Sequence, residues 1–286
     1  MRPTFLIVGA AKCGTTSLFE LLSAHPEIGM STIKEPNFFS RDPVFQRGWE
    51  WYESLFAGRE AKLAVGEASH TYTKIGIYPH AVARIAEHLP EARLLYIVRH
   101  PLVRMESGWA QQVYGRVTRL RQDFNTSLRT VPSIVESSLY WKQISAYRTH
   151  YPDERIHTLF LEDLKRDPHG ELARCFAFLG VNPDFRVPGA ERPRNARAGR
   201  TIDEPLGDSL WFSVLRRLAP RSVKSAIRYE IPPAVWDEDT RRWAIERVVD
   251  DSLQFLRFYG KPPDFWDFRP VPTGTRLPPE IEVGSS

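Results

Sequence analysis

The sequence predicts an α/β fold in which a central parallel sheet is flanked by helices. Short, mainly apolar runs with the length of buried strands alternate with segments of helical periodicity. The runs lie at residues 5–8, 63–67, 93–99 and 156–160. Such alternation is typical of βαβ units, whose strands pair in parallel. The 286 residues, 42% of them hydrophobic, favour one domain over residues 1–270 with a helical carboxyl-terminal part, followed by a proline-rich tail at 271–286.

The first strand leads into a glycine-rich loop and a helix. Gly9 ends the apolar run, and leucines recur at helical spacing until His25-Pro26 stops the pattern. The first N–H groups of a helix have no intrahelical acceptor, and the dipole is positive at that end. Strand, loop and helix together therefore predict a site for a phosphorylated ligand.

The loop is close to the nucleotide P-loop pattern G-x-x-x-x-G-K-[ST]. Gly9 and Gly14 have the required spacing, but Thr15 stands where the lysine belongs, and the only lysine is Lys12. A lysine inside the loop still brings positive charge to an oxyanion, whereas the usual arrangement for Mg-ATP is missing. The alternative at this point is a tight turn that binds no ligand.

Composition and charge limit the possible partners. The formal charge of +4 suits an anionic ligand but is too small to indicate nucleic acid. Cys13 and Cys175 lie in unrelated contexts, which predicts neither a disulfide nor a metal site. Cys13 is either a thiol of lowered pKa or a small residue beside a phosphate. No run has the length of a signal peptide or a membrane span, so we expect a cytoplasmic protein without a membrane partner.

Two polar segments follow the first helix. Lys34-Glu35 precedes a proline and the pair Phe38-Phe39, which predicts a charged pair on a loop held by aromatics, either functional or solvated. A short amphipathic helix is expected over residues 45–60. The strand at 63–67 then leads to His70. If the sheet is parallel, His70 lies at its carboxyl edge, where such sheets bind ligands, although a lone histidine is often structural.

A helix over 79–88 leads to the strand at 93–99, and Pro101 starts the next helix. Arg99, at the strand end, and Ser107, two turns into the helix, are placed to bind one phosphate. The alternative is an arginine paired with a carboxylate at the sheet edge.

The remaining segments carry weaker signals. Residues 115–135 are polar with weak periodicity, which predicts a surface loop in contact with an acceptor substrate. Helices are expected over 138–151, up to Gly180, near 211–218 and over 243–259. The arginine-rich run at 188–200 is either a loop that closes over an anion or a solvated segment.

Taken together, these segments resemble the sulfotransferases that use 3′-phosphoadenosine-5′-phosphosulfate (PAPS), over most of residues 4–182. Residues 4–24 are similar to the family's 5′-phosphosulfate loop, and Arg99 with Ser107 matches its 3′-phosphate pair. The resemblance assigns the 5′ end of the donor to Lys12, Cys13, Gly14, Thr15, Thr16 and Ser17. The run that contains Asn195, Arg197, Gly199 and Arg200 is similar in place to the loop that closes over the nucleotide.

The resemblance implies a fold related to the P-loop kinases and in-line transfer of a sulfuryl group to a hydroxyl or amine. Lys12 would neutralise the leaving phosphate without a metal ion, and a general base would take the acceptor's proton. Glu35 matches the base of the heparan-sulfate type and His70 that of the small-molecule type, although Ala68 stands where the heparan-sulfate type has lysine. We favour His70 as the base, with Glu35 either as the base or as the residue that orients the acceptor.

The sequence therefore predicts a PAPS-dependent sulfotransferase that acts on a small-molecule or carbohydrate acceptor, with the oligomeric state left open. Two alternatives are a P-loop kinase that uses Mg-ATP and a non-catalytic nucleotide-binding protein. The prediction requires the Lys12 loop and the Arg99–Ser107 pair to face a single nucleotide.

Overall fold

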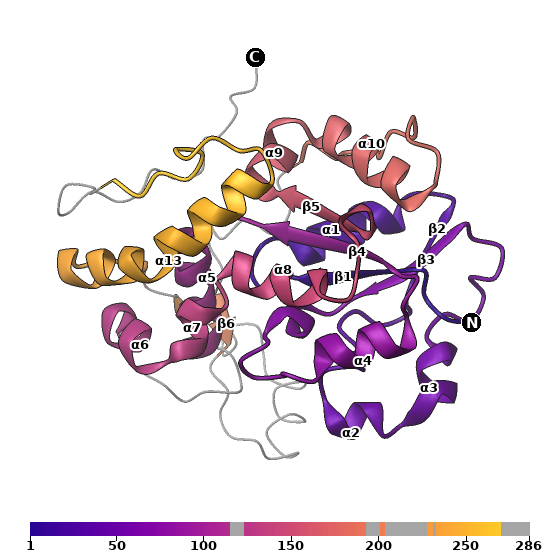
Figure 1. Cartoon of the computed structure of the whole chain (residues 1–286), viewed down its shortest axis with the longest axis horizontal. Helices are drawn as coiled ribbons and strands as arrows, with labels where there is room; N and C mark the ends of the chain where they lie inside the picture. Colours follow the sequence, from indigo (N-terminus) through magenta and orange to yellow (C-terminus); the bar gives the residue numbers. More distant parts are fainter. Residues whose placement is uncertain (115–122, 193–200, 204–227, 231–232, 270–286) are drawn as a thin grey trace.

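A computed structural model describes residues 1–114, 123–192, 201–203, 228–230 and 233–269 (Figure 1). Its centre is a parallel sheet with the strand order β2-β3-β1-β4-β5. The strands are β1 (Phe5–Gly9), β2 (Ile28–Met30), β3 (Ala64–Ala68), β4 (Arg93–Val98) and β5 (Ile156–Phe160). The predicted fold class is confirmed, and β2 is an additional strand that is too short to carry a sequence signal.

Helices cover both faces of the sheet, because successive strand side chains point to opposite faces. Leu6 and Leu94 belong to one buried cluster, whereas Ile7 and Leu95 belong to another. Figure 1 shows the sheet between these two layers. The first cluster includes side chains of α4 (Ala81–His88), α8 (Tyr140–Arg148) and α13 (Glu238–Phe258), and the second those of α1 (Thr15–Ser23), α9 (Leu161–Arg166) and α10 (Pro168–Leu179).

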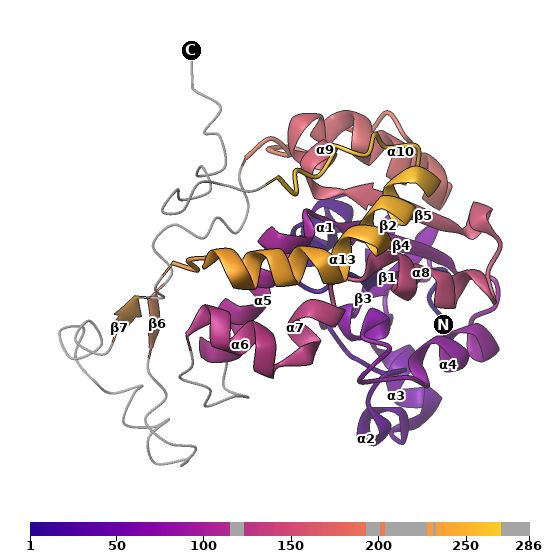
Figure 2. The ribbon, with the colours of Figure 1, turned by 60° about the vertical axis from the view of Figure 1, so that its left-hand side comes forward.

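A third cluster lies among the helices α5 (Pro101–Tyr114), α6 (Phe124–Thr130), α7 (Pro132–Glu136) and α13. Figure 2 shows α13 running from these helices towards α8. The prediction of a surface loop over 115–135 is wrong from residue 124 onward. Both helices are too short for a clear period, but Asp123 caps α6 by accepting the N–H of Thr126 at 3.0 Å, and Pro132 starts α7.

The shorter elements complete the chain. The helix expected over 45–60 is shorter, and a separate short helix precedes it; Gly48, with a φ of +78°, lies at the start of the second helix. The two helices are α2 (Asp42–Phe45) and α3 (Gly48–Ser54). Two 3₁₀ helices, η1 (His70–Thr73) and η2 (Asp153–Arg155), precede α4 and β5, and β6 (Thr201–Asp203) pairs antiparallel with β7 (Arg228–Glu230).

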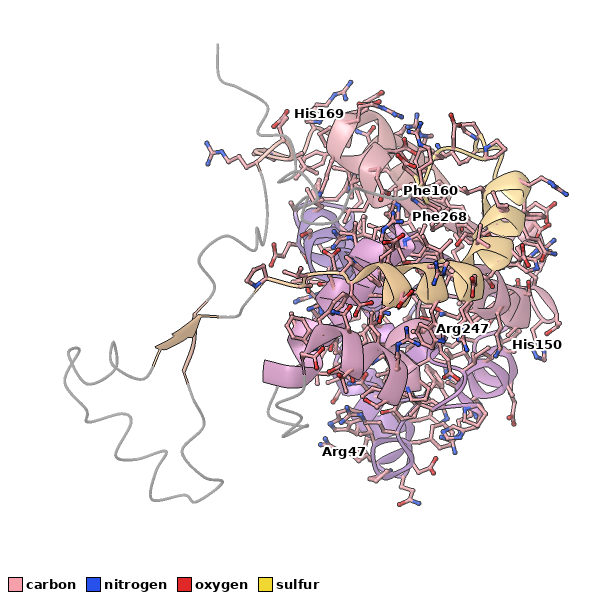
Figure 3. The ribbon with its side chains drawn as sticks, turned by 90° about the vertical axis from the view of Figure 1, so that its left-hand side faces the viewer. Arg47, His150, Phe160, His169, Arg247 and Phe268 are labelled. Atoms are coloured by element: carbon pink, nitrogen blue, oxygen red, sulfur yellow. The ribbon has the colours of Figure 1, made fainter. Side chains whose placement is uncertain are left out.

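The segment after α13 docks through aromatic side chains. Trp266 is buried, with its ring centroid 5.7 Å from that of Phe160, and Phe268 packs against the same cluster (Figure 3). The helix predicted near 211–218 and the tail at 271–286 lie outside the described residues. Within the described ranges, none of the helices combines the length and the apolar character that crossing a bilayer requires.

Candidate active site

The loop between β1 and α1 lies at the carboxyl edge of the sheet, where parallel α/β proteins bind ligands. Gly14 is the amino-terminal cap of α1 with a φ of +98°, and no side chain caps the helix. A β-carbon at Gly14 would lie 3.0 Å from Cδ1 of Leu161. The first-turn N–H groups of Thr15, Thr16 and Ser17 have no acceptor within the helix. This geometry suits an anion.

The other two loop residues play different parts. Lys12 has a left-handed φ of 69°, a conformation that side chains adopt only with support. The Cys13 thiol is buried, with its sulfur 3.4 Å from the hydroxyl of Tyr140. Burial raises the pKa of Cys13 to about 11, so the alternative of a thiol with lowered pKa is wrong. The Cys13 side chain fills the core beneath the loop.

Arg99 follows the end of β4 and reaches the same loop. Its Nη1 donates a long hydrogen bond of 3.4 Å to the Lys12 carbonyl, and the Tyr140 hydroxyl donates to the Arg99 carbonyl at 2.8 Å. Ser107 lies further along α5 and is 7% exposed. The structure thus brings Arg99 and the Lys12 loop together at one edge of the sheet.

The sheet edge also carries a carboxylate near Arg99, on α9. Oε1 of Glu162 accepts the backbone N–H of His100 at 2.7 Å, next to the start of α5. Burial raises the pKa of Glu162 against the opposing charge of Arg99. Glu162 therefore acts on the backbone at the start of α5, whereas the guanidinium of Arg99 contacts the loop.

His70, the first residue of η1, meets Glu35, which lies on the loop after β2. Nδ1 of His70 lies 2.9 Å from Oε1 of Glu35, and Nζ of Lys34 lies 2.5 Å from the same oxygen. The N–H of Glu35 donates to the Ala68 carbonyl at 2.9 Å, which holds this loop against the end of β3. Glu35 has a left-handed φ of 58°, so the loop is strained where it presents the carboxylate.

The environment sets the charge state of this pair. Burial alone would raise the pKa of Glu35, but the hydrogen bonds from His70 and Lys34 outweigh it and lower the pKa to about 2. Burial lowers the pKa of His70, although Glu35 opposes that shift. At neutral pH, His70 is then a neutral imidazole that donates Nδ1–H to a carboxylate, with the Nε2 lone pair available as a base.

A buried carboxyl network lies behind the pair, and sequence reasoning missed it. The Ser69 hydroxyl donates to Glu67 at 2.8 Å and accepts the N–H of Asn37 at 3.0 Å. The hydroxyls of Tyr72 and Tyr52 donate to the other oxygen of Glu67. Burial raises the pKa of Glu67 to about 7. The available signal was a glutamate inside an otherwise apolar strand.

Two cations near the site were also missed. Arg104 on α5 donates from Nε to the Ala11 carbonyl at 3.1 Å. Lys74 follows η1, and burial together with the charge of Arg104 lowers its pKa to about 8. The sequence contains one indication of a role for Arg104, which is its position between Arg99 and Ser107, the two residues predicted to bind a phosphate. The predicted contacts Asn195, Arg197, Gly199 and Arg200 lie outside the described residues. Among residues with described positions, no cluster of three or more His, Cys, Asp or Glu side chains is arranged to hold a metal ion.

The fold and the site together define a class of protein. A parallel sheet, an uncapped helix start and a second basic group at the next strand end are typical of α/β proteins that bind an anionic ligand at the carboxyl edge of the sheet. A sequence model of the family described as "Sulfotransferase domain" matches residues 2–195. The chain therefore belongs to the sulfotransferase domain family.

The chain is also similar in sequence to individual sulfotransferases. The chain is 27% identical over 243 residues to heparan sulfate glucosamine 3-O-sulfotransferase 5 of Mus musculus, covering 82% of this chain and 66% of that protein. It is 31% identical over 188 residues to heparan sulfate glucosamine 3-O-sulfotransferase 6 of Homo sapiens, covering 63% and 52%. The chain thus spans between about half and two thirds of these relatives' length.

A solved sulfotransferase from Alicyclobacillus acidocaldarius is 26% identical, with a TM-score of 0.68 over 93% of this chain and 99% of that one. The predicted family and fold are confirmed, and sulfotransferases are enzymes that use PAPS as the sulfuryl donor. The family match favours sulfuryl transfer over the alternative of an ATP-dependent kinase.

Proposed function

We propose that this chain transfers the sulfuryl group of PAPS to a hydroxyl or amine of a glycan or small-molecule acceptor. The observation that carries the proposal is the 3.4 Å hydrogen bond from Arg99 to the Lys12 carbonyl. It brings the two groups that are predicted to bind phosphates to one sheet edge, as a donor with phosphates at two ends requires. A protein in which the two groups lay on different faces would not fit this donor.

The donor's two ends are assigned to different residues in this proposal. Lys12 and the N–H groups of the first turn of α1 hold the 5′-phosphosulfate, with Lys12 stabilising the negative charge that develops on the leaving oxygen. Arg99 binds the 3′-phosphate as a fork of charged donors, and Ser107 adds a hydroxyl. Arg197, Gly199 and Arg200 complete the proposed nucleotide site on the basis of the sequence alone.

His70 is the proposed general base. Its Nε2 takes the proton of the acceptor hydroxyl while the acceptor oxygen attacks sulfur, and the bond from sulfur to the 5′-phosphate oxygen breaks. The products are the sulfated acceptor, 3′-phosphoadenosine-5′-phosphate (PAP) and a protonated His70. Oε1 of Glu35 accepts the hydrogen bond from Nδ1–H, with 2.9 Å between nitrogen and oxygen, and the carboxylate stabilises the imidazolium that forms.

The acceptor is proposed by analogy. The relatives named above act on heparan sulfate glucosamine, which supports a carbohydrate hydroxyl as the first acceptor to test. A small-molecule hydroxyl or amine is the alternative, and the cytoplasmic location that the sequence predicts stays a prediction.

The test is binding of PAP by isothermal titration calorimetry, followed by assays with labelled PAPS and a panel of glycan and phenolic acceptors. We expect PAP binding at low salt that Lys12→Met weakens, and a labelled product with at least one acceptor. Tighter binding of Mg-ATP than of PAPS would favour the kinase. PAP binding with no turnover on any acceptor would favour the non-catalytic alternative.

A further inference from the structure

Arg104 lies near the start of α5 and is only 2% exposed. Its Nε donates to the Ala11 carbonyl at 3.1 Å, and its Nη1 donates to the Ser138 hydroxyl at 3.2 Å and to the Ile134 carbonyl. All three acceptors are neutral groups. The guanidinium thus joins the β1–α1 loop to α7 and to the segment between α7 and α8.

The charge of Arg104 has no counter-charge in the part of the chain that the structure describes. No aspartate or glutamate there forms an ion pair with it, and the nearby Arg99 and Lys74 are cations as well. Burial lowers the pKa of Arg104, but a guanidinium stays protonated at neutral pH. A buried charge without a counter-ion is costly. An anion bound in the adjacent loop would remove that cost.

We propose that Arg104 is a positioning residue for the donor, which holds the Ala11 carbonyl and balances the negative charge of the donor's 5′ group from beneath the loop. This inference rests on the proposed function, because it takes the loop ligand to be a nucleotide with an anionic 5′ group. The new element is a buried positive charge that acts on the donor without contacting it.

The loop geometry gives the inference its physical basis. Arg104 holds the carbonyl of Ala11, and Arg99 holds the carbonyl of the next residue, Lys12. A peptide unit is planar and trans, so its N–H points opposite to its carbonyl. Fixing the Ala11 carbonyl towards Arg104 therefore turns the Lys12 N–H away from the guanidinium. The Ala11 carbonyl is directed at the buried Arg104, and this keeps its negative end away from an anion bound in the loop.

Gly108 provides the space that this arrangement needs. A β-carbon at Gly108 would lie 2.8 Å from Nη2 of Arg104. Glycine inside a helix is unfavourable relative to alanine, so its presence in α5 is explained by the room it leaves for the guanidinium. Gly108→Ala is therefore a way to displace Arg104 while keeping its charge and improving the intrinsic helix propensity.

The test compares two nucleotides, PAP and adenosine 3′-phosphate, which lacks the 5′ anion, on the full chain by calorimetry. Arg104→Met should weaken PAP binding by about tenfold or more and adenosine 3′-phosphate binding by less than about threefold, because the lost charge acts on the 5′ group. Arg104→Lys keeps the charge and should retain PAP binding within about threefold. Ser138→Ala, which removes one acceptor of Arg104 and no charge, is the matched control and should also bind PAP nearly normally.

Gly108→Ala keeps the inference testable if Arg104→Met does not fold, as judged by circular dichroism. Displacement of the guanidinium should weaken PAP binding more than adenosine 3′-phosphate binding. Equal weakening of both nucleotides in the folded variants would mean a purely structural role and would overturn the inference. So would wild-type PAP affinity in Arg104→Met, or an Arg104→Lys variant as weak as Arg104→Met. Failure of the wild-type chain to bind PAP would instead count against the proposed function itself.

Discussion

Nδ1 of His70 lies 2.9 Å from Oε1 of Glu35. The sequence presents these residues as competing candidates for one role, 35 positions apart and after different strands. The contact makes them a single unit in which each alters the other's proton affinity. A carboxylate that holds one imidazole nitrogen leaves the other as the base. Neither residue type alone indicates that one residue acts as the base while the other orients it.

The first prediction separates the two roles. His70→Ala should lower kcat for sulfuryl transfer by about two to four orders of magnitude, because a general base contributes that much. Glu35→Gln should cost less, since an amide oxygen can still accept Nδ1–H. The measurement is kcat with one acceptor, alongside calorimetry with PAP, which neither variant should alter. A larger loss in Glu35→Gln than in His70→Ala would assign the base to Glu35.

The second prediction concerns the pH dependence of the rate. The base must be neutral, and burial lowers the pKa of His70 below its ordinary value of 6.5. The rate should therefore be constant near neutral pH and fall only at a pH below 6.5. Glu35 raises the pKa of His70, so Glu35→Gln should move the acid limb of the pH–rate profile to lower pH. A shift to higher pH in this variant would contradict the proposed pairing.

The sequence was sufficient where the signals are local. An apolar run, a glycine turn and a helix that begins at a proline are each recognised from about ten neighbouring residues. The strands β1, β4 and β5 and the loop after β1 could therefore be predicted. The helices at 124–136 could not, because they are stabilised by packing against α13, more than a hundred residues away. The contact of Glu35 with His70 depends on long-range placement in the same way.

The third prediction concerns Glu67. Because its carboxyl group is buried, it binds a proton more tightly in the folded protein than in the unfolded chain. Its pKa is about 7 in the folded protein against an ordinary 4.5. A raised carboxyl pKa contributes stability that is present at low pH and is lost as the pH rises through 7. Ionisation of Glu67 should lower the free energy of unfolding by roughly 3 kcal/mol at pH 8 relative to pH 4. Glu67→Gln should remove this pH dependence from the free energy of unfolding, measured by urea titration at both pH values.

The matched control for Glu67 is Glu87→Gln, at an exposed position on α4. It should leave the difference between pH 4 and pH 8 unchanged. If Glu67→Gln has the same pH dependence as the wild type, then Glu67 is not the group whose ionisation limits stability above neutrality.

The fourth prediction tests which end of the donor each cation binds. Arg99→Met should weaken PAP binding by about 10- to 100-fold, the value of a charged hydrogen bond. It should weaken the binding of adenosine 5′-phosphosulfate, which has no 3′-phosphate, much less. Lys12→Met should weaken both ligands, since both carry the 5′ group. Equal losses for both ligands in Arg99→Met would place Arg99 at the 5′ end instead.

The last prediction concerns the start of α1. Gly14 has a φ of +98°, and a β-carbon there would lie 3.0 Å from Cδ1 of Leu161, whereas Gly58 has a φ of +76° with open space around it. Gly58→Ala therefore measures the conformational cost alone, about 1–2 kcal/mol, and should not affect PAP binding.

Gly14→Ala should cost more than Gly58→Ala, because steric pressure on Leu161 adds to the strain. It should also weaken PAP binding, because any shift of residue 14 moves the first N–H groups of α1 away from the anion. Thermal unfolding gives the stabilities and calorimetry the affinities. If Gly14→Ala lost only as much stability as Gly58→Ala and bound PAP normally, the helix start would not be the anion site. The 5′ group of the donor would then have to be held by side chains alone.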